Sequence, residues 1–297
     1  MAPIKLYFFD TENFGDALSG MLVSHLSGRK VVVTSSFEAE MSAVGSILRI
    51  GDLCRNSPHS TIDAVKYLRR KVMDFLSPKL KVWGTGFLKV QHFDSFARVR
   101  NVEVLATRGE LTRTVLRRYG FLSEKSKVVL GDPGLLYPLL MQDRPSVKYE
   151  VGLVPHEDDF IFGKYLEGKL LSLGVRVKFI DVHSKNPLSV LDEIASCERI
   201  LSSSLHGCVV ADALGIPNRM LLLSYFGRPA EQHLFKYRDY YSAYGLDIDP
   251  LGYEALLEKL SETLRSVCTK YKVSASQVAE LKAGLLRTFP FKKEHDE

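Results

Sequence analysis

Short apolar segments alternate with amphipathic helical patterns along the whole 297-residue chain. Apolar runs of roughly four to eight residues are typical of buried strands, whereas apolar residues three and four positions apart are typical of helices. In the first half we expect strands at 4–9, 30–33, 43–50, 81–83, 102–106 and 127–130, and helices at 16–27, 61–76 and 109–119. Strands that alternate with helices predict an α/β fold with parallel sheets.

The pattern is interrupted at residues 141–148, which are mostly polar and include a proline. We therefore predict two Rossmann-like domains with a central cleft, one spanning 1–143 and the other 149–297. In the second half we expect strands at 149–154, 175–180, 199–203 and 219–223, and helices at 159–173, 187–196, 206–214, 252–268 and 274–288. Ligands of open α/β sheets lie beyond the carboxyl ends of the strands, so the loops that follow strands are the places to seek a site.

Composition narrows the class of protein. Hydrophobic residues make up 45% and charged residues 25%, as in soluble globular proteins, and no apolar run is long enough to cross a bilayer. The first residues lack a signal-peptide pattern and the four cysteines lack CxxC spacing, so we expect a reduced, cytoplasmic protein. A net charge of +5 suits phosphates, carboxylates or peripheral association with the acidic inner face of a membrane, and it is too small to indicate nucleic acid.

The turn Ser203-Ser204-Leu205-His206-Gly207 is the first candidate site, since a strand ends at the serines and a helix begins near His206. Free backbone N–H groups and the positive end of the helix dipole favour a phosphate or carboxylate at such a turn. Serine hydroxyls add donors and cap the helix, His206 can donate a hydrogen bond or a proton, and Gly207 allows close approach. The alternative is a serine-capped helix with a packed histidine, and the position after a strand favours the anion site.

The loop after the first strand, residues 10–16, is the second candidate site. Gly15 permits a tight turn, and Asp16 is placed to cap the following helix. The carboxylates of Glu12 and Asp16 and the amide of Asn13 suit the hydroxyl groups of a sugar. A loop that only caps the helix is the equal alternative.

Arg108 and Trp83 each lie at the end of a predicted strand. The guanidinium of Arg108 could hold an anion through two parallel hydrogen bonds, or it could pair with Glu110 or Glu103 on the surface. Trp83 precedes Gly84-Thr85-Gly86, which is neither a dinucleotide fingerprint nor a P-loop, and packing in the core is the alternative to a place in the site.

His156 and the segment 234–241 supply the remaining candidates. His156 follows the first strand of the second half, and the acidic residues after it do not predict a metal site because no partner motif exists elsewhere. The segment 234–241 is basic and aromatic, so Lys236 and Arg238 could guide an anionic donor into a cleft. It could equally be a surface helix with packed tyrosines.

Together these motifs resemble the polysaccharide pyruvyl transferase family. The resemblance rests on Asn13-Phe14-Gly15-Asp16, Trp83-Gly84-Thr85-Gly86, Arg108-Gly109, Gly131-Asp132-Pro133, Ser203-Ser204-Leu205-His206-Gly207 and Ala213-Leu214-Gly215-Ile216-Pro217. It implies a fold like that of the two-domain GT-B glycosyltransferases, with no metal and no cofactor. It also implies transfer of pyruvate from phosphoenolpyruvate onto two hydroxyls of a sugar, as a cyclic ketal. The acceptor would belong to a surface or secreted glycan or to its lipid-linked oligosaccharide precursor.

Roles follow from the resemblance together with the position of each residue. His206 is the expected acid or phosphate ligand, and Asp16 or Glu12 the group that orients or deprotonates the acceptor. The other expected donor contacts are Arg108, Ser203, Ser204, Leu205, Gly207, Lys236 and Arg238. The expected acceptor contacts are Asn13, Phe14, Gly15, Trp83 and His156. Some relatives carry arginine where this chain has Ser204, so Arg108 would hold more of the anion. A nucleotide-sugar glycosyltransferase of the same architecture and a non-catalytic glycan-binding protein stay open as alternatives.

Overall fold

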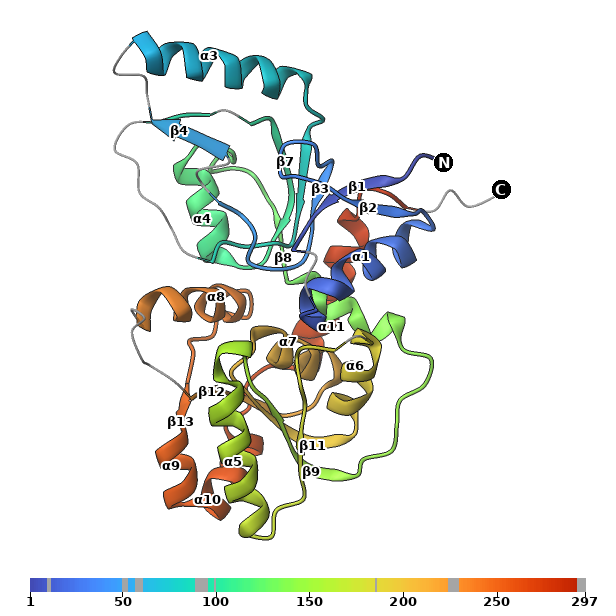
Figure 1. Ribbon diagram of the computed structural model, residues 1–297, viewed down its shortest axis with the longest axis vertical. Helices are drawn as coiled ribbons and strands as arrows, with labels where there is room; N and C mark the ends of the chain where they lie inside the picture. Colours follow the sequence, from blue (N-terminus) through green and yellow to red (C-terminus); the bar gives the residue numbers. More distant parts are fainter. Residues whose placement is uncertain are drawn as a thin grey trace.

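A computed structural model describes residues 1–9, 12–49, 53–56, 61–88, 96–98, 100–184, 186–223 and 230–292. The chain forms two parallel sheets, which Figure 1 shows in separate halves of the molecule, the first half above and the second below. The predicted α/β class with parallel sheets is confirmed. The likeness to the GT-B arrangement stays a prediction. None of the described helices is both long and apolar enough to cross a membrane.

The first sheet has the strand order β2-β1-β3-β5-β7-β8, and every neighbouring pair is parallel. Its strands are β1 Ile4–Tyr7, β2 Val31–Val33, β3 Met41–Ser42, β5 Leu80–Trp83, β7 Val102–Thr107 and β8 Val129–Leu130. The helices of this half are α1 Phe14–Ser27, α3 Thr61–Leu76, α4 Glu110–Arg118 and the 3-10 helix η1 Pro133–Leu140. An antiparallel pair, β4 Cys54–Asn56 and β6 Phe96–Arg98, lies outside the sheet.

The strand predicted at 43–50 is wrong. Strand β3 is only Met41–Ser42, and residues 43–49 form a loop, whereas residue 50 lies outside the described residues. Gly45 has a φ of 105°, which turns the chain out of the extended conformation directly after the strand. The apolar character of this segment therefore reflects a buried loop.

The second sheet has the order β10-β9-β11-β12-β13 and is also parallel. Its strands are β9 Tyr149–Val154, β10 Val177–Phe179, β11 Cys197–Ser202, β12 Asn218–Leu222 and β13 Leu251–Gly252. Its helices are the 3-10 helix η2 Glu157–Asp159, α5 Phe160–Ser172, α6 Pro187–Ala195, α7 Leu205–Leu214, α8 Ala230–Ser242, α9 Tyr253–Glu258, α10 Leu260–Thr269 and α11 Ala275–Thr288. The helix predicted at 252–268 is two helices, since the backbone of Lys259 leaves the helical region at φ −133° and ψ 53°.

Each sheet reverses its strand order at the strand that comes first in its half of the chain. In the first sheet β1 lies between β2 and β3, and in the second β9 lies between β10 and β11. At such a switch point the following connections diverge to opposite faces, which opens a crevice at the carboxyl ends of the two strands. Each half therefore offers one crevice, beside β1 and beside β9.

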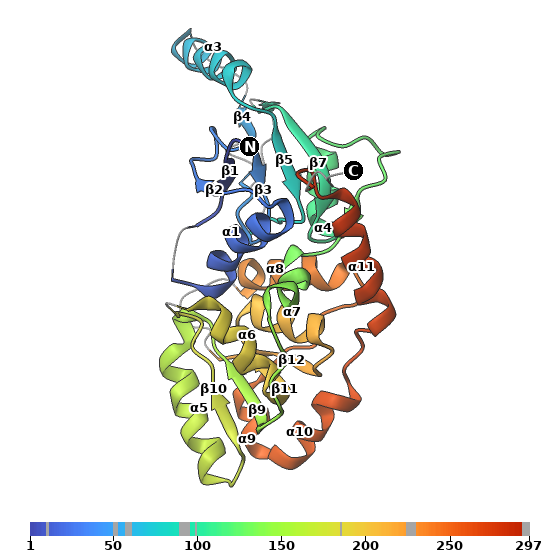
Figure 2. The ribbon, with the colours of Figure 1, turned by 90° about the vertical axis from the view of Figure 1, so that its right-hand side faces the viewer.

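The two halves share packing as well as a chain connection. The largest core cluster combines Phe14 and Leu18 of α1 with Ile194 of α6 and Val210 of α7. Helix α11 leaves the second half and packs against β8 and η1, and Figure 2 shows it along the side of the molecule. The chain passes from the first sheet to the second between η1 and β9, and the domain boundary itself stays a prediction.

Candidate active site

A cavity of 260 Å³ lies between the two halves, where the carboxyl ends of both sheets face each other. Its lining comes from the loops after β1, β3, β5, β9 and β11 and from helix α8. The lining residues are Phe9, Asn13, Asp16, Ser46, Leu88, His156, Glu157, Ser204, Leu205, His206 and Lys236. Both switch points therefore open into one cavity. The selected loops after β1, β9 and β11 meet there, whereas Arg108 after β7 does not line it.

Helix α7 points its N-terminus at this cavity. Ser204 is the N-cap residue by position, but its hydroxyl accepts no hydrogen bond from the helix. The expected serine cap is therefore wrong. The hydroxyl of Ser202 instead accepts a hydrogen bond from the backbone N–H of Ser204 at 3.1 Å. An N-terminus without a side-chain cap keeps donors and a positive dipole end for a ligand. The Cα of Gly207 packs closely against Ser202, since a Cβ there would lie 2.3 Å from Ser202 Oγ, and Gly207 does not line the cavity.

The imidazole of His206 lies where the starts of α1 and α7 meet. Its ring centroid is 6.3 Å from those of Phe14 and Tyr137, and a Cβ on Gly15 would lie 2.0 Å from Nδ1. Its Nε2 has no hydrogen-bond partner within the described part of the chain. Burial, then the charges of Lys236 and Arg108, lower the pKa of His206 from 6.5 to about 3. The site therefore holds a neutral imidazole whose Nε2 is unused by the described residues.

The first loop caps its helix differently from the prediction. Helix α1 begins at Phe14, and the side chain of Asn13 accepts from Gly15 N at 3.2 Å. Asp16 lies in the first turn and lines the cavity, so the expectation that Asp16 is the cap is wrong. Glu12 is exposed and outside the lining. Among the carboxylates of this loop that the structure describes, Asp16 is the one that lines the cavity.

Phe14 and Gly15 hold this loop in position through contacts outside the cavity. Phe14 is fully buried in the core, and its backbone N–H donates to Val182 O at 2.8 Å. The carbonyl of Gly15 accepts from the Tyr137 hydroxyl at 2.6 Å. Neither residue lines the cavity, so both position Asn13, Asp16 and His206.

His156 enters the cavity from the end of β9. Its backbone N–H donates to the Ser203 hydroxyl at 2.9 Å, which ties the loop after β9 to the loop after β11. Its Nδ1 lies 3.3 Å from Asp158 Oδ2. Burial, then the charge of Lys236, lower the pKa of His156 to about 4. The Ser203 hydroxyl is occupied by this bond and does not line the cavity.

Helix α8 brings Lys236 to the cavity and resolves the two interpretations of segment 234–241. Its tyrosines pack inward, and the Tyr237 hydroxyl donates to Ser203 O at 2.6 Å. Lys236 lines the cavity, whereas Arg238 is exposed and outside the lining. Burial and the charge of Arg108 lower the pKa of Lys236 to about 8. The segment is therefore a packed helix that presents one cation to the site.

Arg108 is fully buried and its guanidinium has three protein partners. Nε donates to Asp239 at 2.9 Å, Nη2 to Phe87 O at 2.7 Å, and Nη1 to the hydroxyl of Ser46. The ion pair with Asp239 has no exposed surface on either side chain. Arg108 thus reaches the cavity only through Ser46, and it ties the first half to α8.

Helix α4 receives its N-terminal cap from α8. Gly109 is the N-cap residue and has no side chain, and Asp239 accepts from Thr112 N at 2.8 Å while the Ser242 hydroxyl accepts from Glu110 N at 2.9 Å. A Cβ on Gly109 would lie 1.6 Å from Asp239 O, so only glycine permits this approach. The cap is therefore a contact between the two halves.

Trp83 lies in the core and not in the cavity. It is fully buried, its indole N–H donates to Leu285 O at 3.0 Å, and its ring packs on Phe289 at 5.0 Å. Sequence reasoning did not name Ser46 or Glu157 as lining residues. The rule that loops after strands carry the site would have selected Ser46 if the strand had been placed at 41–42.

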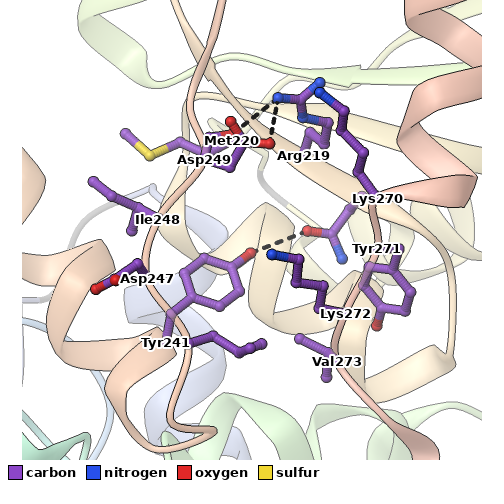
Figure 3. A pocket seen from close by; sticks show the side chains of 12 residues that line it. Arg219, Met220, Tyr241, Asp247, Ile248, Asp249, Lys270, Tyr271, Lys272 and Val273 are labelled. Carbon is purple, nitrogen blue, oxygen red and sulfur yellow. Dashed lines mark hydrogen bonds and ion pairs between the residues drawn. The ribbon is translucent and has the colours of Figure 1, made fainter.

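A second cavity of 60 Å³ lies at the amino end of β12 (Figure 3). Arg219 there pairs with Asp249 at 2.7 Å, and the Tyr241 hydroxyl donates to Asn218 at 3.3 Å. It is smaller than the first cavity and lies at the wrong end of the sheet for the ligand of an open α/β fold. We therefore place the candidate active site in the first cavity.

Three comparisons relate the chain to known proteins, and the family model is the one that agrees with the motifs. The chain is 26% identical over 300 residues to an uncharacterized protein of Acanthamoeba polyphaga mimivirus, covering 98% of this chain and 92% of that protein. A crystal structure of a functionally uncharacterized protein of Klebsiella pneumoniae aligns over 78% of this chain and 87% of its own, at 11% identity and a TM-score of 0.42. Residues 62–225, more than half of the chain, match the family model described as polysaccharide pyruvyl transferase. The chain therefore belongs to the polysaccharide pyruvyl transferase family.

Proposed function

We propose that the protein transfers pyruvate from phosphoenolpyruvate to two hydroxyls of a sugar and forms a cyclic pyruvate ketal. The sugar would belong to a surface or secreted glycan or to its lipid-linked precursor. The observation that carries the proposal is the composition of the 260 Å³ cavity. It combines an uncapped helix N-terminus, His206 and Lys236 from the second half with Asp16 from the first.

The donor has a phosphate and a carboxylate, so it needs two positions that favour negative charge. The start of α7 at Ser204, Leu205 and His206 suits the phosphate, because backbone N–H groups and the helix dipole act together there. Lys236 suits the second group. Arg108 supports the site indirectly, since it does not line the cavity and its Nη1 donates to Ser46, which does.

The chemistry requires a proton for the donor and a base for the acceptor. Protonation at C3 of the enol develops positive charge at C2, a first sugar hydroxyl adds there, and a second hydroxyl displaces inorganic phosphate. Burial keeps His206 neutral, and a bound phosphate dianion would favour its protonated form. Asp16 would orient the acceptor diol and accept a proton from it. Each turnover consumes one phosphoenolpyruvate and one diol and yields one ketal and one phosphate.

The test is phosphate release by the full-length protein from phosphoenolpyruvate in the presence of free or lipid-linked sugars. Release that depends on the acceptor, with a product heavier than the acceptor by the mass of pyruvic acid less one water, supports the proposal. Transfer from a nucleotide sugar in the absence of phosphoenolpyruvate would reject it, as would binding of glycans without any turnover.

The rate should fall at alkaline pH as Lys236 loses its proton. Because its pKa is lowered to about 8, the ammonium form that binds an anion is present below pH 8 and disappears above it. We expect kcat/KM for phosphoenolpyruvate to be level at pH 7 and to fall about tenfold per pH unit well above 8. The Lys236→Met variant should be slow throughout and lack this limb. Lys169→Met, which changes an exposed lysine of α5, should keep the wild-type profile.

Gly15→Ala should impair activity through His206 without unfolding the protein. The added Cβ would overlap the imidazole at Nδ1, so the ring must move. Displacement of a catalytic group by about 1 Å can cost about 10²-fold in rate. Kinetics and thermal melting measure the two effects separately. The matched control is Gly168→Ala in α5, where a Cβ meets nothing within 4 Å. Equal activities of the two variants would contradict the assigned position of His206.

A further inference from the structure

Helix α3 exposes a large apolar face. Seven of its apolar side chains keep between 49% and 89% of their surface exposed: Ile62, Val65, Leu68, Val72, Met73, Phe75 and Leu76. Both ribbon views place α3 at the end of the molecule farthest from the second sheet (Figures 1 and 2). Contiguous apolar surface of this kind on a soluble protein marks an interaction site.

The position of α3 in the topology makes this exposure unusual. The helix lies in the connection between β3 and β5, which are neighbouring parallel strands. Helices in such connections ordinarily cover the sheet with their apolar face. Here the core cluster around β5 is completed by Val115 and Leu116 of α4 and by Tyr119, and it includes no described residue of α3. The apolar face of α3 is therefore available to a partner outside the chain.

Basic residues border this face. At about 100° per residue the apolar side chains occupy about half of the helix circumference, with Lys66 on one border, Lys71 on the other and Arg69 within it. Asp63 falls on the opposite side. Lys71 lies 5.8 Å from the ring of Tyr67, which adds an aromatic group to the border. A second copy of this face would bring like charges together, whereas an anionic surface complements them.

We propose that α3 lies in the interface of a lipid bilayer that contains anionic lipid. The apolar face would enter the acyl boundary, and Lys66, Arg69 and Lys71 would reach the acidic headgroups. The 16 residues span about 24 Å, less than the roughly 30 Å of a bilayer core, so the helix lies on the membrane and does not cross it. The inference is independent of the reaction in the cavity, because membrane binding is measured without substrate.

Co-sedimentation of the full-length protein with vesicles tests this proposal. We expect binding to phosphatidylcholine vesicles that contain phosphatidylserine, weaker binding to phosphatidylcholine alone, and loss of affinity as salt is raised. The double variant Leu68→Glu/Phe75→Glu should bind at least about tenfold more weakly. The double variant Lys66→Glu/Arg69→Glu should lose the preference for anionic lipid.

The matched control is Ile161→Glu/Leu171→Glu, which puts two glutamates at exposed apolar residues of α5 and should bind like the wild type. Absence of vesicle binding by the wild-type protein would overturn the proposal. So would equal loss in the α5 control and the α3 variant. A wild-type dimer that ignores vesicles and becomes a monomer in Leu68→Glu/Phe75→Glu would assign the face to a second copy instead.

Discussion

Replacement of His206 by alanine is expected to reduce turnover by about 10²–10⁴-fold while the protein stays folded. His206 lines the cavity from the second half and packs beside Phe14 and Gly15 of the first, and its Nε2 has no partner among the described residues. Because Nε2 of His206 has no protein partner in the described part of the chain, its removal does not leave another described group without a hydrogen bond. The expected loss is therefore one of chemistry rather than of stability, and steady-state kinetics with thermal melting will separate the two.

A second substitution distinguishes the two roles proposed for His206. Glutamine can donate a hydrogen bond to a phosphate but cannot transfer a proton at neutral pH. If His206 only binds phosphate, His206→Gln should recover much of the activity lost in His206→Ala. If His206 is the acid, both variants should be equally slow while KM for phosphoenolpyruvate recovers in the glutamine variant. A rate for His206→Ala close to that of the wild type would remove His206 from the mechanism.

Asp239→Ala is expected to be the most destabilising single change, at about 3–5 kcal/mol. Asp239 is fully buried and pairs with Arg108, whose charge would remain inside the protein without compensation. The substitution also removes the acceptor for the backbone N–H and the hydroxyl of Thr112, at 2.8 and 2.7 Å. Because these contacts join α8 to α4, we expect the two halves to lose their connection near the cavity.

Thermal and urea unfolding will measure this effect against a matched control. Asp249→Ala also removes an aspartate from an arginine pair, with Arg219, but Asp249 is 63% exposed. Exposed pairs contribute about 0–1 kcal/mol, so this variant should unfold nearly like the wild type. Similar unfolding free energies for the two variants would show that the pair at Arg108 is not a major link between the halves.

Much of the site could be predicted because its residues lie in loops that follow strands. Asn13, Asp16, His156 and His206 were selected on that rule, and all four line one cavity. The rule works because parallel strands deliver their carboxyl ends to one edge of a sheet. It does not say which residue of a loop caps the helix, and so the cap is Asn13 and not the predicted Asp16, although both line the cavity.

Arg108 shows where sequence reasoning ends. Its position after β7 suggested a direct grip on the donor, and no nearby residue indicates its actual partner. Asp239 lies 131 positions further along the chain, in a segment for which a helix was only one of two interpretations. The pair forms only because α8 packs on α4. Arg108 is therefore directed to Asp239, and Lys236 is the predicted cation that lines the cavity.

The sequence by itself determined the local features of this protein: the alternation of strands and helices, the helix start at 204–207 and the order of motifs that marks its family. These depend on residues close together in the chain, through backbone preferences, periodicity and turn chemistry. Only the tertiary structure decided that both switch points open into one cavity, that Trp83 belongs to the core and Arg108 to an ion pair, and that α3 keeps its apolar face exposed. These outcomes depend on which distant side chains exclude water from one another, and spacing along a sequence does not carry that information.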